Sequence, residues 1–125
     1  MKLNVRYGLA TVGYMTGIFV LSASQLNVIP ASRLVLKVLH VPLFAGLAAC
    51  VLMGLGQGPW SETGSWQLYG LVGVVAGGYA AFDEWHQSFV PGRIASVGDF
   101  LLDCLGIALY LGIYRLIVRG IHDGR

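Results

Sequence analysis

Four apolar stretches, separated by short polar connections, constrain this chain more than any other feature of its sequence. They run over about residues 7–23, 34–55, 67–82 and 97–118. A helix that crosses a bilayer needs about 20 predominantly apolar residues. Only 11% of the residues are charged, against roughly 25% in soluble domains, and the mean hydropathy is +0.71. The sequence therefore predicts an all-α membrane protein, with four transmembrane helices in a single domain over residues 1–125.

An even number of spans places both termini on the same side of the membrane. The basic residues expected on that side are Lys2, Arg6, Arg115, Arg119 and Arg125, and those on the other side are Arg33, Lys37 and Arg93. Because basic residues favour the cytoplasmic side of a membrane protein, the termini are predicted to be cytoplasmic. The net charge of +2 is too small to suggest a nucleic-acid partner.

Glycines recur at helical spacing in two of the apolar stretches. Gly13 and Gly17 are four residues apart, and Gly70, Gly73 and Gly77 follow one stripe. Small residues at this spacing let helices approach closely. We expect these faces to pack against a neighbouring helix, which includes the helix of a second copy or of another membrane protein.

A polar window interrupts the apolar pattern between the third and fourth stretches. Four of the six carboxylates lie there, and charge at the edge of a bilayer usually marks function. Val90-Pro91-Gly92 predicts a turn. Four spans bring this window and the start of the second stretch to one face of the membrane, predicted to be the outer one. The residues able to converge there are Lys37, His40, Asp83, Glu84, His86, Gln87, Arg93, Asp99 and Asp103.

Three kinds of chemistry fit this set of residues. In the first, Arg93 and Lys37, held by the carboxylates, bind an anionic lipid head group, because a guanidinium suits bidentate recognition of phosphate or carboxylate. In the second, the chain is an enzyme with a general base or a divalent metal; its candidate catalytic residues are Asp83, Glu84, His40 and Asp99. No compact ligand motif such as HExxH supports the metal. In the third, an ion-pair network only ties the helices together, as in a helper or assembly subunit.

The polar window resembles the VanZ-like family of small bacterial membrane proteins. The family pattern D-E-x-x-Q-x-F-x-P-x-R is followed by an Asp, by Asn or Asp four residues later, and by a Gly. The matching residues are Asp83, Glu84, Gln87, Phe89, Pro91, Arg93, Asp99, Asp103 and Gly106, with Lys37, His40 and Phe44 upstream. The resemblance covers the second to fourth stretches. Leu36 departs from it where many members have Asp, and Asp103 stands where Asn is common.

The resemblance implies a multi-pass protein of the bacterial inner membrane that works in the cell envelope. The family takes its name from a determinant that lowers susceptibility to the glycopeptide teicoplanin, and it supplies no reaction. We therefore expect recognition of an anionic envelope lipid or lipid-linked cell-wall precursor. The predicted ligand-binding residues are Arg93 as principal contact, Lys37 and His40 beside it, and Asp83, Glu84, Gln87, Asp99 and Asp103 positioning them.

Overall fold

The computed structural model is a bundle of four α-helices over the residues that it describes, which are 4–24, 30–55 and 66–124. The helices are α1 (Val5–Ala23), α2 (Pro30–Gly54), α3 (Trp66–Gln87) and α4 (Val97–Asp123). The predicted all-α class is confirmed, and every predicted stretch is a helix. Lys2, Arg125 and the side chain of Arg33, which entered the charge count, lie outside the described part.

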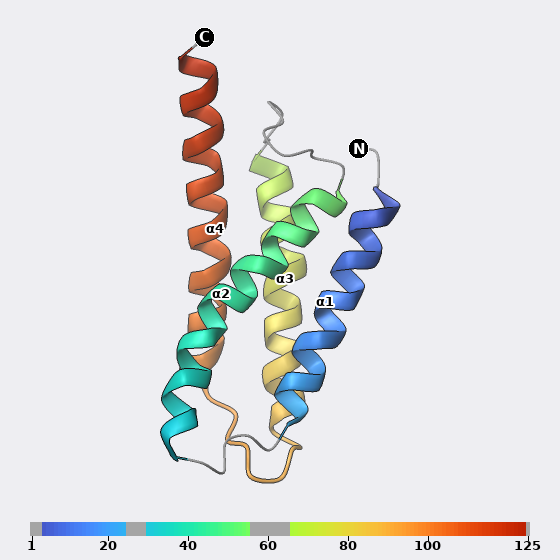
Figure 1. Cartoon of the computed structure of the whole chain (residues 1–125), viewed down its shortest axis with the longest axis vertical. Helices are drawn as coiled ribbons and strands as arrows, with labels where there is room; N and C mark the ends of the chain where they lie inside the picture. Colours follow the sequence, from blue (N-terminus) through green and yellow to red (C-terminus); the bar gives the residue numbers. More distant parts are fainter. Residues whose placement is uncertain (1–3, 25–29, 56–65, 125) are drawn as a thin grey trace.

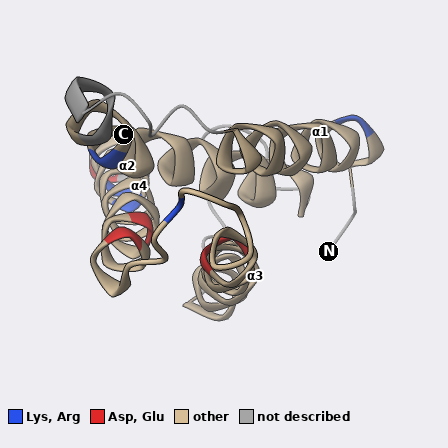
Figure 2. Ribbon diagram, turned by 90° about the horizontal axis from the view of Figure 1, so that it is seen from below, with Lys and Arg blue, Asp and Glu red and all other residues tan. Residues whose placement is uncertain are grey.

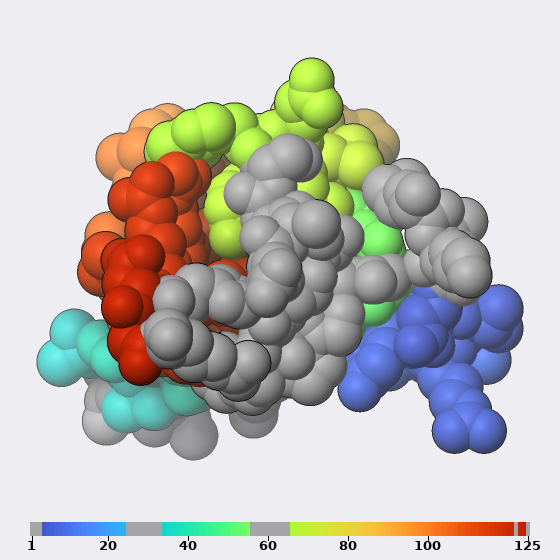
Figure 3. All heavy atoms as spheres, turned by 90° about the horizontal axis from the view of Figure 1, so that it is seen from above, coloured from blue at the N-terminus to red at the C-terminus, as the bar shows by residue number. Residues whose placement is uncertain are grey.

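Figure 1 shows α2 crossing the bundle diagonally between α1 and α4, with α3 behind it. Contacts of α2 with α4 are the most extensive in the bundle, and α2 also contacts α1 and α3. The start of α1 and the end of α4 lie at one end of the bundle, here called the upper end (Figure 1); that both termini face the same side of a membrane stays a prediction. Seen from above, the last turns of α4 and the first turns of α1 lie on opposite sides of that end (Figure 3). The other end, here called the lower end, carries the connection between α3 and α4.

The outside of the bundle is apolar on all four helices. The buried core is built mainly on α2 and α3, around Phe44, Leu47, Val72 and Ala76. Exposed apolar side chains include Leu9, Val12 and Val20 on α1, Val35 and Val38 on α2, Val74 on α3, and Leu101 and Leu116 on α4. An exterior of this kind suits a solvent as apolar as lipid.

Two of the described helices, rather than the predicted four, are long and apolar enough to cross a membrane. These candidate spans are Leu34–Gly54 in α2 and Val97–Ile121 in α4. The shortfall has a compositional cause: Arg6 and several Gly, Thr and Tyr residues dilute α1, and Asp83, Glu84 and several glycines dilute α3.

The glycines divide into two groups by what surrounds them. A Cβ added at Gly106 in α4 would overlap the backbone carbonyl of Val41 in α2, so these two helices touch there. In contrast, a Cβ at Gly13 or Gly17 would have nothing within 4 Å, and the same holds for the predicted stripe on α3, Gly70, Gly73 and Gly77. Within the described chain no other helix packs closely against these two faces, and their packing against a partner stays a prediction.

Candidate functional site

A tight turn at the lower end directs Arg93 back toward the bundle. The backbone N–H of Arg93 donates to the carbonyl of Val90 at 3.1 Å, and Gly92 has a φ of 81°. Pro91 followed by a glycine with positive φ is the pattern of a type II turn, so the predicted turn is confirmed. Seen from below, the basic segment of this connection lies between acidic segments of α3 and α4 (Figure 2).

The guanidinium of Arg93 is held by a relay of hydrogen bonds. Its Nη1 donates to Gln87 Oε1 at 3.0 Å, and Gln87 Nε2 donates to Asp83 Oδ2 at 2.8 Å. Its Nη2 donates to the carbonyl of Leu21, at the end of α1, at 3.2 Å. Asp83 and Gln87 are each only 1% exposed. An amide and a backbone carbonyl therefore make the direct contacts with Arg93, and the carboxylate of Asp83 acts on it through Gln87.

Burial and charge act in opposite directions on Arg93. The side chain is half-buried, and this desolvation lowers the pKa of Arg93, while the negative charges of Asp83, Glu84 and Asp99 oppose the shift. A partly desolvated cation gains more from an added anionic partner than a solvated one does. The guanidinium is therefore fixed in place and still suited to a further contact.

His40 and Asp103 form a second buried contact, between α2 and α4. Nδ1 of the imidazole lies 2.7 Å from Oδ1 of Asp103, and the carboxylate is fully buried. The contact lies beside the close approach of Val41 and Gly106 described above. Because a side chain at residue 106 would separate the two helices, Gly106 is what permits this distance.

The first turn of α4 is fixed by Ser96, which the sequence analysis missed. Ser96 Oγ accepts the backbone N–H of Gly98 at 3.2 Å, as an N-cap does. The backbone N–H of Ser96 donates to Glu84 Oε1 on α3. The spacing of Ser96 and Asp99 matches the S-x-x-D capping pattern, a signal that could have found this residue. In the folded chain Glu84 provides the second cap contact from the neighbouring helix.

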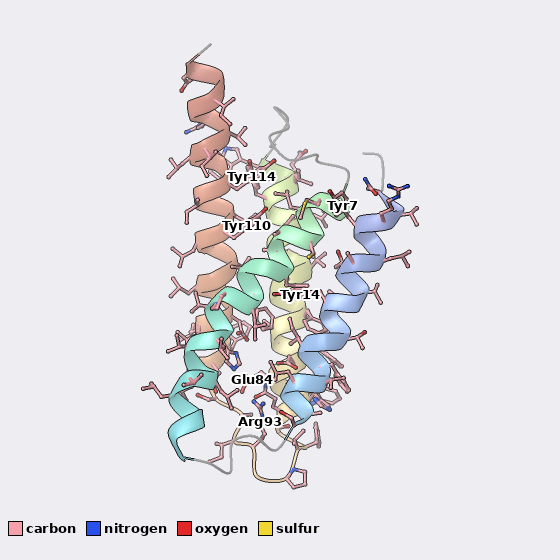
Figure 4. The ribbon with its side chains drawn as sticks, viewed as in Figure 1. Tyr7, Tyr14, Glu84, Arg93, Tyr110 and Tyr114 are labelled. Atoms are coloured by element: carbon pink, nitrogen blue, oxygen red, sulfur yellow. The ribbon has the colours of Figure 1, made fainter. Side chains whose placement is uncertain are left out.

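A cavity of about 260 Å³ lies at the lower end, and Arg93, Gln87, His40 and Ser96 are part of its lining. Its lining consists of Leu36, Lys37, His40, Gln87, Gly92, Arg93, Ile94, Ser96 and Asp99. Lys37 Nζ lies 3.8 Å from Asp99 Oδ1, and the lysine side chain is 55% exposed. Figure 4 shows Glu84 and Arg93 together at this end, below all the labelled tyrosines. The cavity wall therefore carries two basic side chains, Lys37 and Arg93, and one acidic side chain, Asp99.

Eight of the nine residues expected to converge take part in the contacts or the cavity lining described above, which together are here called the cluster. His86 does not. The imidazole of His86 packs against the ring of Phe19, with centroids 4.2 Å apart, and it does not line the cavity. Leu21 and Ser96 join the cluster instead. The roles of all these residues in binding or catalysis stay predictions.

The network leaves several buried atoms without a hydrogen-bond partner. They are Asp83 Oδ1, Glu84 Oε2, Asp99 Oδ1, Asp103 Oδ2 and Arg93 Nε. Buried polar atoms of folded proteins nearly all have partners. No three His, Cys, Asp or Glu side chains in the described part of the chain are placed to hold a metal ion, so the predicted metal gains no support from this geometry.

Comparison with known proteins reports a family and no individual relative. Curated proteins and solved structures give no significant match. A family model described as VanZ/LLP1 matches residues 9–118, which is most of the chain, and the protein therefore belongs to the VanZ/LLP1 family.

Proposed function

We propose that the protein is a multi-pass protein of the bacterial inner membrane, with four spanning helices, cytoplasmic termini and the cavity at the outer leaflet. Apolar residues face outward on all four helices, which supports immersion of α1 and α3 as well as of the two candidate spans. Arg6, Arg115 and Arg119 lie at the upper end, against Lys37 and Arg93 at the lower end. This excess of basic residues favours a cytoplasmic upper end.

We further propose that the cavity binds the phosphate or carboxylate of an envelope lipid or lipid-linked cell-wall precursor. The observation that carries this proposal is the placement of Arg93, whose guanidinium is fixed at the cavity by Gln87 and by the carbonyl of Leu21. A cation already held in place loses little freedom when a ligand binds. Lys37, in the same wall, adds a second positive charge.

The surroundings of the cavity favour a lipid over a water-soluble anion. Leu36 and Ile94 form part of the lining, and Ile94 is 83% exposed. Val35, next to Leu36 in the sequence, and Val97, three residues after Ile94, are also exposed. An acyl chain can therefore lie against an apolar surface while the head group reaches the basic residues.

Lipid retained through purification tests the proposal. Wild-type protein and the Arg93→Ala and Arg115→Ala variants are purified in an uncharged detergent, and bound phospholipid is quantified by mass spectrometry. Arg115 is the matched control because it is an arginine at the other end of the bundle. We expect Arg93→Ala to lose at least about tenfold in retained lipid, which corresponds to about 1.4 kcal/mol. Equal retention by the two variants would reject the head-group function.

One contact favours a second function, hydrolysis or group transfer on the same lipid. His40 lines the cavity while its Nδ1 is oriented by Asp103, which is the geometry of a general base and its positioning carboxylate. Incubation with a total envelope lipid extract, followed by mass spectrometry, tests this function. A product made by wild type and absent with His40→Gln, which still retains lipid, would establish it. If no product forms, the enzymatic function is rejected and only the binding function remains.

The family resemblance extends the proposal to glycopeptide susceptibility. We propose that expression in a susceptible bacterium raises the minimal inhibitory concentration of teicoplanin, and that Arg93→Ala removes the effect. The helper-subunit alternative is tested by Asp99→Asn. Loss of folding in this variant, together with no lipid bound to wild type, would identify the network as purely structural.

A further inference from the structure

We propose that the head group recognised at this cavity carries a primary ammonium close to its phosphate, as a phosphoethanolamine group does, and that Asp99 binds the ammonium. This inference rests on the proposed function, because Arg93 and Lys37 are the partners of the phosphate. It adds the charge pattern of the ligand and gives Asp99 a direct contact with it.

The state of Asp99 is the first argument. The residue lines the cavity and is only 8% exposed, yet its Oδ1 has no hydrogen bond. The nearest cation, Lys37 Nζ, lies 3.8 Å away, beyond the roughly 2.7–3.2 Å of an N–H···O hydrogen bond. A buried carboxylate is costly unless it is paired and hydrogen-bonded. Asp99 is therefore the group in the wall that most lacks a cationic hydrogen-bond donor.

The other three carboxylates of the cluster already have a role and do not line the cavity. Asp83 accepts from Gln87, Glu84 accepts from the backbone of Ser96, and Asp103 contacts His40. Among the described residues of the lining, Asp99 is the acid that a ligand meets. A head group that carries only negative charge would be repelled by this carboxylate. A head group with both charges can place its phosphate at Arg93 and Lys37 and its ammonium at Asp99.

The size of the cavity sets a limit on the ligand. Its volume of about 260 Å³ is slightly below the roughly 300 Å³ at which pockets for drug-sized molecules begin. A head group fits within this space, and the rest of a lipid lies outside it along Leu36 and Ile94. A phosphatidylethanolamine lipid and free phosphoethanolamine both present an ammonium two carbons from a phosphate, which is a diester in the lipid and a monoester in the free compound.

Binding of small probes to the full chain in an uncharged detergent tests the charge pattern. The probes are O-phosphoethanolamine, its N-acetyl derivative and sn-glycerol 3-phosphate, with Kd measured by calorimetry. We expect wild type to bind phosphoethanolamine at least about tenfold more tightly than either of the others. Asp99→Asn should bind all three alike, with its affinity for glycerol phosphate retained. Asp123→Asn, the same charge change at an exposed position of the upper end, should keep the preference.

The outcomes separate this inference from the proposed function. Equal binding of the three probes by wild type, or a preference that survives in Asp99→Asn, overturns the ammonium contact; loss of binding in Arg93→Ala would still support the head-group function. If no phosphate probe binds and no lipid is retained, both fail. The N-acetyl probe tests the contact on wild-type protein even if Asp99→Asn does not fold.

A second arm identifies the source of the group. Protein is reconstituted in nanodiscs of mixed phosphatidylethanolamine and phosphatidylglycerol, and the lipids that remain bound after transfer to detergent are compared. Enrichment of phosphatidylethanolamine identifies a membrane lipid as the ligand. Binding of soluble phosphoethanolamine without this enrichment identifies the free compound and overturns the lipid as its source.

Discussion

The two ends of the bundle each hold an arginine, and they hold it in different ways. At the lower end, Arg93 is fixed by directed hydrogen bonds to Gln87 and to the carbonyl of Leu21. At the upper end, the guanidinium of Arg115 lies over the ring of Trp66, with its carbon 3.5 Å from the ring centroid, and 5.8 Å from that of Tyr69. One cation is held by groups with a defined direction, and the other rests on ring faces.

This difference separates a site from an anchor. A stacked cation tolerates small displacements and even a change of cation, because the attraction to a ring face depends weakly on angle. A guanidinium that bridges an amide and a carbonyl depends on its planar fork of donors. Aromatic side chains such as Trp66 and Tyr69 also suit the membrane–water boundary. The contacts at the upper end therefore suit an interfacial anchor, and those at the lower end suit a preorganised pocket.

The largest effect is expected from Asp103→Leu, which removes one partner of the buried contact at the lower end. Leaving His40 unpaired should lower the free energy of unfolding by about 3–5 kcal/mol. The double variant His40→Leu/Asp103→Leu should be closer to wild type, since neither polar group then remains buried alone. Unfolding followed by circular dichroism in mixed micelles of increasing SDS content measures both. A double variant as unstable as the single one would contradict the pairing.

The next effect tests the close approach of α2 and α4. Gly106→Ala should destabilise by about 1–3 kcal/mol, because the new methyl group meets the carbonyl of Val41. Gly112→Ala is the matched control on the same helix, since a Cβ there has nothing within 4 Å, and its change should stay within about 1 kcal/mol. The same SDS titration applies. Similar values for the two variants would mean that the helix crossing is looser than described.

A matched pair of Arg→Lys substitutions then tests the comparison between the ends directly. Arg93→Lys should cost about 1–2 kcal/mol, because an ammonium cannot maintain both hydrogen bonds. Arg115→Lys should cost less than about 1 kcal/mol, because lysine also binds ring faces. Melting temperatures in one detergent measure both variants. A larger loss for Arg115→Lys would reverse the assignment of site and anchor.

The smallest effect on stability is expected from Lys37→Ala. Its pair with Asp99 is long and its side chain is more than half exposed, so the loss should lie between zero and about 1 kcal/mol. Lipid retention should nevertheless fall, since Lys37 faces the cavity. A variant that is strongly destabilised but still retains lipid would move Lys37 from the binding site to the structural network.

Much of this architecture is predictable from the sequence because the signals are local. The length of the apolar stretches predicts the four helices, and Val90-Pro91-Gly92 predicts the turn. Because successive helices run in opposite directions, the start of the second, the end of the third and the start of the fourth meet at one end with their polar residues. The i, i+4 spacing of Asp83 and Gln87 places them on one face of α3, where they form a hydrogen bond. Ser96 also had a readable signal in its capping spacing.

The remaining contacts depend on tertiary packing, which residue types do not encode. The partner of Arg93 on α1 is a backbone carbonyl, and any residue at position 21 would offer one. Glycine spacing alone does not separate Gly106, where a Cβ would meet α2, from Gly13, where a Cβ would have nothing of the described chain within 4 Å. His86 was expected near the cavity because of its position in sequence, but its place on the helix turns it toward Phe19.

The bond between Ser96 and Glu84 links α3 directly to the start of α4. The first turn of α4 leaves backbone donors without helical partners, and one of the groups that satisfies them belongs to α3. The start of α4 is thus fastened directly to α3, in addition to the contacts that the connection makes with α1 and that α4 makes with α2. α3, the connection and α4 form a helical hairpin, and this one stretch of chain supplies all four acidic side chains of the lower end, Asp83, Glu84, Asp99 and Asp103.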